Sequence, residues 1–212
     1  MAAAIAARYP DIELVFIAGD LTNFGNEESL RQVIDALGSD GRKRNIYAVA
    51  GNCDTKPVRR LMGLEGLDVE GRVVELPFAT MVGAGGGLKR AGITSFERSE
   101  NELIEALSPR LTEAAGKVRS LPLIVLSHTP PYGTNADARG ENHIGSKAFA
   151  RMMVMHKPDV WICGHIHESR CVSKEDGTLV LNPGPCSGGC HAVLETEKGP
   201  DGIFLVRAQL FR

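Results

Sequence analysis

The sequence predicts an α/β fold, because short apolar runs typical of buried strands alternate with segments of helical character. Four of these runs share a second property: each ends in Gly or Ser followed directly by a polar residue. They cover residues 12–18, 45–50, 121–126 and 159–163. In α/β sheets, ligands bind in the crevice at the carboxyl ends of the strands. We therefore expect the polar residues after these four runs to meet in one site.

Length and composition fit a single globular domain that covers residues 1–212. The hydrophobic content of 43% and the charged content of 24% are ordinary for a folded protein, which excludes a disordered chain. The formal net charge of -2 argues against a broadly basic surface, so long nucleic acid is not an expected partner. The one basic cluster, Arg42-Lys43-Arg44, is interpreted as a solvated turn.

Cysteine usage and the absence of targeting signals predict a cytoplasmic protein. The five cysteines are irregularly spaced, which indicates a reducing compartment rather than a disulfide scaffold. Cys186 and Cys190 lack a second pair at zinc-finger spacing, so no structural zinc is expected there. No apolar run is long enough to span a membrane, and the first residues lack the features of a signal peptide. We expect no membrane partner.

The first part of the chain predicts helices before and after the apolar runs. Residues 2–8 are strong helix formers, and Asn26 is a typical N-cap for a helix ending near Leu37. Thr55 is a typical N-cap for the next helix, which has Pro57 in its first turn.

The middle of the chain predicts β structure and a loop. Residues 67–76 are expected to be hairpin-like, and residues 78–82 are expected to form a strand. The glycine-rich segment 83–96 fits no strand–GxGxxG–helix register with an acidic residue about 20 positions later. It is therefore interpreted as a flexible loop rather than a dinucleotide site.

The last part of the chain predicts two more helices and a β-rich end. Ser99 and Glu102 form a capping box for a helix ending near Val118. The polar stretch 132–142 is expected to be a long loop without regular structure, of the kind that is usually functional, and residues 144–156 are expected to form a helix. Short strands separated by turns are expected at 170–173, 178–181, 191–197 and 203–210.

The residues after the four apolar runs form a set of metal ligands. Asp20, Asn52, His128 and His165 follow the four runs, and His167 lies two positions after His165, on the same side of an extended segment. A mixed oxygen and nitrogen set suits Mn, Fe, Zn, Co or Ni, whereas Ca or Mg alone would favour oxygen. Because a carboxylate has two oxygens, it can bridge two cations about 4 Å apart. The sequence therefore predicts a metal site for phosphoryl chemistry.

The motifs that carry these ligands resemble those of the calcineurin-like metallophosphoesterases. They are GDLTNFG (19–25), GNCD (51–54), SHTPP (127–131) and CGHIHES (163–169), in the family's order. The segment NPGP (182–185) is similar to the small prokaryotic phosphodiesterase branch. The resemblance implies a four-layer α/β/β/α sandwich with a dinuclear centre at the strand ends. It also implies hydrolysis of a small phosphate ester, more a diester than a monoester, by attack of metal-bound hydroxide.

Matched residue by residue, the resemblance assigns roles to the five ligands. Asp20 is similar to the bridging carboxylate. Asn52, His128 and His165 are similar to the other ligands of one metal, and His167 is similar to a ligand of its neighbour. Asn52 and His128 would also take part in catalysis by holding the ion that polarises the ester.

Three further residues are assigned by the same resemblance. Asp54 would orient the ligands. Cys53 stands where many relatives carry a histidine that assists the leaving group, and a thiol is a poor replacement for an imidazolium. The alternative, a small buried cysteine without a chemical role, stays open. His143 would face the substrate near the pocket mouth, and the alternative is an ordinary loop residue.

The sequence departs from the family in one larger respect. The family begins with a strand ending in Asp-x-His, which supplies two ligands to the metal of His167, and no such motif occurs here. We expect that the sequence begins just after that strand. Without that strand, the second metal would have only Asp20 and His167 as protein ligands. Binding of one metal instead of two therefore stays open. The alternative function is an inactive scaffold or binding protein of the same fold. The substrate, the native metal and a homo-oligomeric state stay open.

Overall fold

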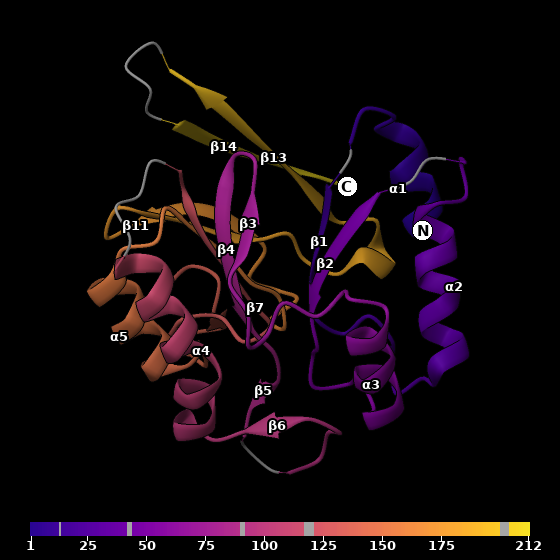
Figure 1. Cartoon of the computed structure of the whole chain (residues 1–212). Helices are drawn as coiled ribbons and strands as arrows, with labels where there is room; N and C mark the ends of the chain where they lie inside the picture. The colour runs from indigo at the N-terminus through magenta and orange to yellow at the C-terminus, as the bar shows by residue number, and fades with distance from the viewer. Residues whose placement is uncertain (13, 42–43, 90–91, 117–120, 200–203) are drawn as a thin grey trace.

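Helices and strands of the chain build four layers, with two β layers between outer layers of helices (Figure 1). The computed structural model describes residues 1–12, 14–41, 44–89, 92–116, 121–199 and 204–212. The largest layer is a six-stranded mixed sheet in the order β11-β12-β10-β7-β4-β3. Its strands are β3 (Val74–Leu76), β4 (Ala79–Ala84), β7 (Leu123–Ser127), β10 (Val160–Ile162), β11 (Cys171–Glu175) and β12 (Thr178–Asn182). Strands β4, β7, β10 and β12 run parallel, and β3 and β11 are antiparallel edge strands.

The second β layer consists of two strand pairs. β1 (Leu14–Ala18) pairs with β2 (Asn45–Val49) in parallel, and β13 (His191–Lys198) pairs with β14 (Phe204–Phe211) in an antiparallel hairpin. Side chains of both pairs pack against the six-stranded sheet in one apolar cluster, in which Phe16, Tyr47, Leu194 and Val206 meet Ile124 and Ile162.

Helices cover the outer faces of both β layers. α4 (Glu100–Gly116) and α5 (Lys147–His156) pack on the six-stranded sheet through a second apolar cluster that includes Leu107, Phe149 and Trp161. α2 (Glu27–Leu37) and α3 (Lys56–Leu64) cover β1 and β2 through a third cluster, and α1 (Ala2–Arg8) lies beside α2. Three apolar clusters thus fill the three spaces between four layers, and the predicted α/β/β/α sandwich is confirmed.

Two of the predicted helix starts have the expected capping hydrogen bonds. The Asn26 side chain accepts from the backbone N–H of Ser29 at 3.0 Å. The Glu102 carboxylate accepts from the backbone N–H of Ser99 at 2.7 Å, which confirms the predicted capping box. Thr55 behaves differently, because its hydroxyl donates to the carbonyl of Gly25 instead of capping α3.

The interpretation of residues 83–96 as a flexible loop is wrong for the part that the structure describes, which excludes residues 90 and 91. Gly83 lies in β4, and two further short strands follow, β5 (Gly87–Leu88) and β6 (Glu97–Arg98). A Cβ on Gly83 would lie 2.4 Å from Val69, and one on Gly87 would lie 2.8 Å from Asn52. These glycines serve close packing rather than flexibility.

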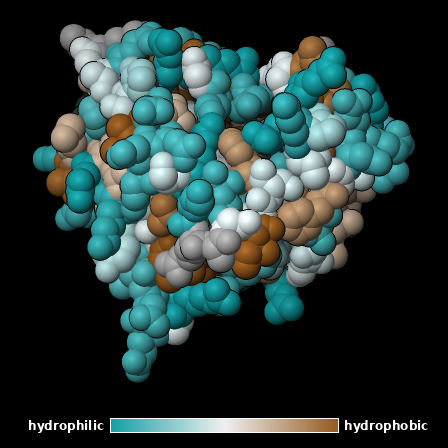
Figure 2. All heavy atoms as spheres, turned by 90° about the horizontal axis from the view of Figure 1, so that it is seen from below, coloured by the Kyte–Doolittle hydropathy of each residue, from teal (hydrophilic) through white to brown (hydrophobic). Residues whose placement is uncertain are grey.

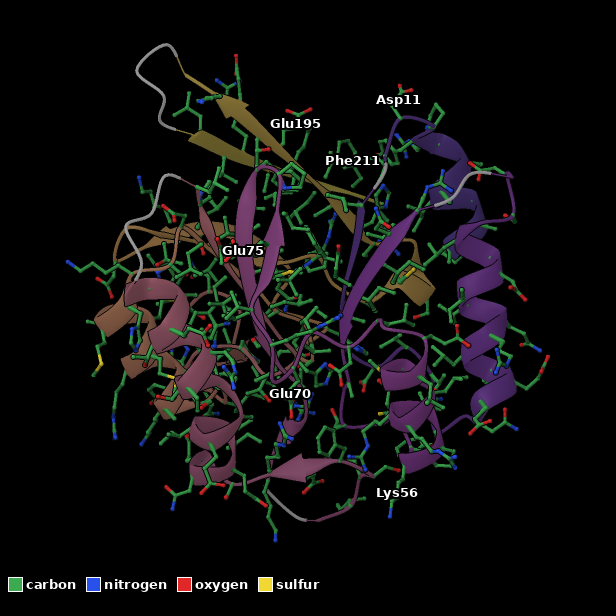
Figure 3. All side chains as sticks on the ribbon, in the orientation of Figure 1. Asp11, Lys56, Glu70, Glu75, Glu195 and Phe211 are labelled. Carbon is green, nitrogen blue, oxygen red and sulfur yellow. The ribbon has the colours of Figure 1, made fainter. Side chains whose placement is uncertain are left out.

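Two other expectations about β structure need correction. Residues 67–76 do not form a hairpin, because Asp68 and Glu70 make single parallel bridges to Ala48 and Gly83 and only β3 pairs regularly. Glu70 lies below the ends of β4 and β7 (Figure 3), where it pairs with Arg98 at 2.7 Å. The stretch 132–142, expected to lack regular structure, contains the first part of a small hairpin made by β8 (Ala138–Arg139) and β9 (Asn142–His143).

The interpretation of the basic cluster as a solvated turn is wrong for Arg44, while Arg42 and Lys43 lie outside the described residues. Arg44 is 8% exposed. Its guanidinium donates to the carbonyls of Leu37 and Ala6 and pairs with Asp40 at 2.7 Å. The cation therefore joins the carboxyl end of α2 to α1, where helix carbonyls lack partners within the helix. None of the described helices has the length and apolar character needed to cross a membrane.

Glu97 holds the segment next to β6 in place and gives this region a pH dependence. Its carboxylate accepts from the Thr94 hydroxyl and from the backbone N–H groups of Gly92, Ile93 and Thr94. These bonds, those from Thr94 above all, lower the pKa of Glu97 to about 2. Because the folded-state pKa is depressed, the stabilisation is complete above the usual pKa of 4.5 and is lost as pH falls towards 2.

We predict that Glu97→Gln lowers the free energy of unfolding at pH 7 and that its difference from the parent protein shrinks as pH falls from 5 to 3. Urea unfolding of both proteins over this range measures the effect. Glu195→Gln, at an exposed site on β13, is the control for loss of a surface carboxylate. A constant difference for Glu97→Gln would contradict the role assigned to its carboxylate.

Candidate metal centre

Four strand ends bring their polar residues together around the imidazole of His128. Its Nε2 lies 2.9 Å from Oδ1 of Asn52, 3.1 Å from Nδ1 of His165 and 3.6 Å from Oδ2 of Asp20. These residues follow β2, β10 and β1, and His128 itself follows β7. The carboxyl ends of parallel strands therefore meet as the sequence predicted.

The protonation of His128 is fixed by its other ring nitrogen. Nδ1 lies 2.7 Å from the carbonyl oxygen of Ala18. Because a carbonyl can only accept, Nδ1 carries a proton, and Nε2 of the neutral ring presents a lone pair to the Asn52 oxygen. The Asp20 carboxylate adds a third acceptor, and the His128 side chain is only 1% exposed. Nδ1 of His165, when it carries a proton, can donate to this lone pair, and a cation can take the place of that proton.

The distances among these donor atoms fit a divalent cation. With bonds of about 2.1 Å, the ligand atoms of a tetrahedral site lie about 3.4 Å apart. The observed separations from Nε2 of His128, 2.9 to 3.6 Å, bracket this value. No group of three or more His, Cys, Asp and Glu side chains in the described ranges is arranged to hold an ion outright. The four residues therefore lie close together and offer donor atoms of the types that a divalent cation binds, with the Asn52 amide as one of them.

Asp20 and His165 adopt backbone conformations that are rare for residues other than glycine. Their φ angles are 50° and 69°. Such left-handed conformations cost free energy and are typical of functional sites, where the surroundings enforce them. Oδ1 of Asp20 accepts from the backbone N–H of Cys53 at 2.8 Å, which turns the carboxylate towards His128.

Two glycines make room for this convergence. A Cβ on Gly19, whose φ is 89°, would lie 2.3 Å from Nδ1 of His128. A Cβ on Gly51 would lie 2.1 Å from Oδ1 of Asp20. No side chain could occupy either position without displacing a candidate ligand.

Asp54 ties together the loops that carry Asp20 and Asn52. Its fully buried carboxylate accepts from the backbone N–H groups of Leu21, Thr22 and Gly51 at 2.9 to 3.1 Å, and from the Thr22 hydroxyl at 3.0 Å. Burial raises the pKa of Asp54, and the backbone hydrogen bonds partly offset this rise. Asp54 thus positions both loops.

Cys53 presents a neutral thiol. Burial, followed by the nearby Asp20 charge, raises its pKa to about 12. The thiol therefore stays protonated at neutral pH, and it cannot carry the positive charge of an imidazolium.

His167 stands apart from the cluster. It is exposed and lines, with Asp20 and His165, a cavity of about 950 Å³. The described contacts around His128 reach His165 but not His167.

His143 has a partner that the sequence reasoning missed. Its Nδ1 lies 2.5 Å from Oδ1 of Asp137, a fully buried carboxylate that also accepts from the N–H groups of Gly133 and Gly145. The His143 side chain is 42% exposed, so its other ring nitrogen is accessible. The signal in the sequence was an Asp six positions before the His on a turn-rich stretch.

The hairpin that carries His143 is attached to the segment containing His165 and His167. The Ser169 hydroxyl donates to the carbonyl of Ala138, and Arg139 pairs with Glu168 at 3.2 Å. The hairpin therefore lies next to the GHIHES segment.

We predict that Gly51→Ala weakens binding of Mn²⁺ at least about tenfold, because the added methyl displaces the Asp20 carboxylate. Gly63→Ala is the matched control, since a Cβ there meets nothing within 4 Å. Titration calorimetry of both variants with Mn²⁺ measures the effect. Equal affinity in the two variants would show that Asp20 is not a ligand.

Comparisons with known proteins were made against families, curated sequences and solved structures. Residues 3–169 match the calcineurin-like phosphoesterase family. The chain is 31% identical over 191 residues to an uncharacterised protein of Methanocaldococcus jannaschii, covering 88% of this chain and 82% of that one. It is 26% identical over 191 residues to a UPF0046 protein of Caenorhabditis elegans, covering 85% of this chain and 65% of the relative.

Solved structures share the fold at low identity. One crystal structure superposes with a TM-score of 0.70 at 15% identity, covering 99% of this chain and 91% of that one. A protein of Thermus thermophilus superposes with a TM-score of 0.66 at 16% identity, covering 98% and 91%. The match over residues 3–169, together with this shared fold, establishes that the chain belongs to the calcineurin-like phosphoesterase family.

Proposed function

We propose that this protein hydrolyses small phosphodiesters with the help of a divalent cation such as Mn²⁺. Membership of the family supports a metal-dependent phosphoesterase in general. The observation that carries the proposal is the convergence of Asn52, Asp20 and His165 on the lone pair of His128. A cation bound there would polarise the ester and lower the pKa of a water molecule towards neutrality.

The residues of the chain have separate tasks in this proposal. The Ala18 carbonyl keeps the proton of His128 on Nδ1, so Nε2 remains free to bind. Asp54 keeps the loops of Asp20 and Asn52 in register. His143, oriented by Asp137, binds a phosphate oxygen of the substrate.

One observation supports a diester rather than a monoester, and a second favours a good leaving group. None of the described hydrogen bonds or ion pairs to Asp20, Asn52 or His128 comes from Lys or Arg, which suits a singly charged diester better than a doubly charged monoester. The neutral thiol of Cys53 leaves the site without an imidazolium at that position, so a good leaving group is favoured.

The face at the β5–β6 end is mostly hydrophilic, with apolar residues in small separate groups (Figure 2). All five cysteines are free, which supports a cytoplasmic location as part of the proposal.

A binding protein without catalysis is the second candidate. It is favoured by the high pKa of the Cys53 thiol and by the separation of His167 from the His128 cluster. Elemental analysis of the purified protein distinguishes the two candidates, because one or two equivalents of transition metal support the enzyme and none supports the binding protein.

We predict that Asp20→Ala and His165→Ala each lower kcat/KM for a nitrophenyl phosphodiester by at least about 100-fold in the presence of Mn²⁺, because each removes a ligand. His156→Ala, at the end of α5, is the control and should keep its activity. Chelation by EDTA should abolish turnover, and added Mn²⁺ should restore it. Unchanged turnover in Asp20→Ala or His165→Ala would contradict the proposal.

We predict that His143→Ala lowers kcat/KM for the same diester by about 10- to 100-fold while Mn²⁺ affinity stays within about twofold of the parent. The two readouts separate substrate binding from metal binding. His191→Ala on β13 is the control for loss of a partly buried imidazole. Equal activity in His143→Ala and the parent would show that His143 is a loop residue without a role in substrate binding.

A further inference from the structure

Arg59 on α3 carries a positive charge that no described residue pairs with. The side chain is half-buried, and its Nε is fully shielded from solvent without a hydrogen-bond partner. None of the hydrogen bonds or ion pairs among the described side chains involves its guanidinium, which contacts an aromatic ring instead. Because a shielded cation without a counter-charge is costly, Arg59 is a candidate for binding an anion.

The ring of Phe96 orients this guanidinium. The central carbon of the Arg59 guanidinium lies 3.9 Å from the centroid of the ring, which is van der Waals contact between two flat groups. Such stacking uses the face of a guanidinium, whereas its N–H donors lie in the plane of the group and remain available. Phe96 therefore fixes the direction of the Arg59 fork without taking up its donors.

The second arginine at this ring has partners of its own. The Arg98 guanidinium lies 4.5 Å from the centroid of Phe96 and donates to both oxygens of Glu70, at 2.7 and 2.8 Å, and to the carbonyl of Gly85. Glu70 neutralises Arg98, so the excess positive charge and the available donors belong to Arg59. Burial, followed by the nearby charge of Arg98, lowers the pKa of Arg59. An anion beside Arg59 would offset both effects.

The other carboxylates near Arg59 are directed to backbone groups. Asp54 accepts from three backbone N–H groups of the loops after β1 and β2. Asp68 accepts from the backbone N–H of Glu70 at 3.0 Å. Since neither forms an ion pair with Arg59, an anion that pairs with this cation would come from outside the chain.

This pair of cations lies beside the candidate metal centre but outside its cavity. The backbone N–H of Phe96 donates to the carbonyl of Asn52 at 3.0 Å. α3 and β6 lie next to each other at this end of the molecule (Figure 1), and Phe96 directly precedes β6. None of Arg59, Phe96 and Arg98 lines the cavity that His167 lines. A ligand could therefore reach the metal centre and Arg59 with different groups.

We propose that Arg59, stacked on Phe96, binds an oxoanion, either a carboxylate or a phosphate group, in one arm of the substrate. This inference rests on the phosphodiesterase function proposed above. The diester would lie at the His128 cluster, and its charged arm would extend past Asn52 to Arg59. The planar fork of the guanidinium matches two oxygens at once, which selects such an arm over a neutral one.

Anion binding is tested without turnover. The whole chain is titrated with inorganic phosphate at constant ionic strength in the presence of EDTA, and the side-chain Nε–H signal of Arg59 is followed by NMR. Its absence from the spectrum of Arg59→Lys assigns the signal. We expect a saturable shift at Arg59 and none at Arg60, which is adjacent and exposed. No shift at Arg59 up to about 50 mM phosphate would overturn the proposal.

Turnover tests whether the anion belongs to the substrate. Two nitrophenyl phosphodiesters are compared over a series of chain lengths, one with an alkyl group as its second alcohol and one with a carboxyalkyl group. We expect at least about a tenfold preference in kcat/KM for a carboxyalkyl diester, lost in Arg59→Gln and kept in Arg60→Gln. A preference that survives in Arg59→Gln, or no preference in the parent, would overturn the assignment to the substrate. If neither diester is hydrolysed, the proposed function fails, and the phosphate titration still decides on the anion site.

Phe96→Leu tests the role of the ring. Leucine keeps an apolar side chain against the cluster of Leu61 and Met62 but offers no flat face to the guanidinium. Phosphate affinity at Arg59 should fall by about three- to tenfold, whereas Arg60→Gln should leave it within about twofold of the parent. Equal affinity in Phe96→Leu and the parent would overturn the stacked arrangement as the basis of binding.

Discussion

The carboxylate of Asp54 is the constraint on which the site depends. It bonds at once to the loop after β1 and to the loop after β2, through Leu21, Thr22 and Gly51. A buried carboxylate is costly, and in this position the cost is offset by four hydrogen bonds that also fix the separation of two strand ends. The left-handed backbone at Asp20 is held by this arrangement.

The electrostatics of the cluster follow from that fixed geometry. Asp20 and Asn52 approach the same nitrogen of His128 from the ends of two paired strands, β1 and β2. Nδ1 of His165 lies 3.1 Å from the same nitrogen, so a hydrogen-bond donor from His165 and a bound cation would occupy the same place.

Local patterns in the sequence predicted those parts of the structure that depend on local chemistry. The strand ends of Asp20, Asn52, His128 and His165 and the cap at Asn26 follow from alternation and short-range hydrogen bonds. The errors concern residues whose partners are distant. Gly87 was misinterpreted because it makes room for the side chain of Asn52, which lies 35 positions earlier in the sequence. Arg44 was misread because the carbonyl of Ala6 that it binds belongs to another helix.

The same limit explains why Asp137 was missed and why the conformation of His165 could not be foreseen. The role of Asp137 is visible only in the fold, where a turn brings His143 next to its carboxylate. The φ of 69° at His165 could not be predicted from the sequence, because a positive φ is expected mainly at glycine. Sequence reasoning thus identified the candidate donor atoms but not the left-handed backbone conformations that orient them.

Gly19 and Gly51 limit how the site can vary. A Cβ at Gly19 would lie 2.3 Å from the His128 ring, and one at Gly51 would lie 2.1 Å from the Asp20 carboxylate. Any variant that keeps the cluster must therefore keep both glycines, which makes these two positions a simple screen for relatives that retain it.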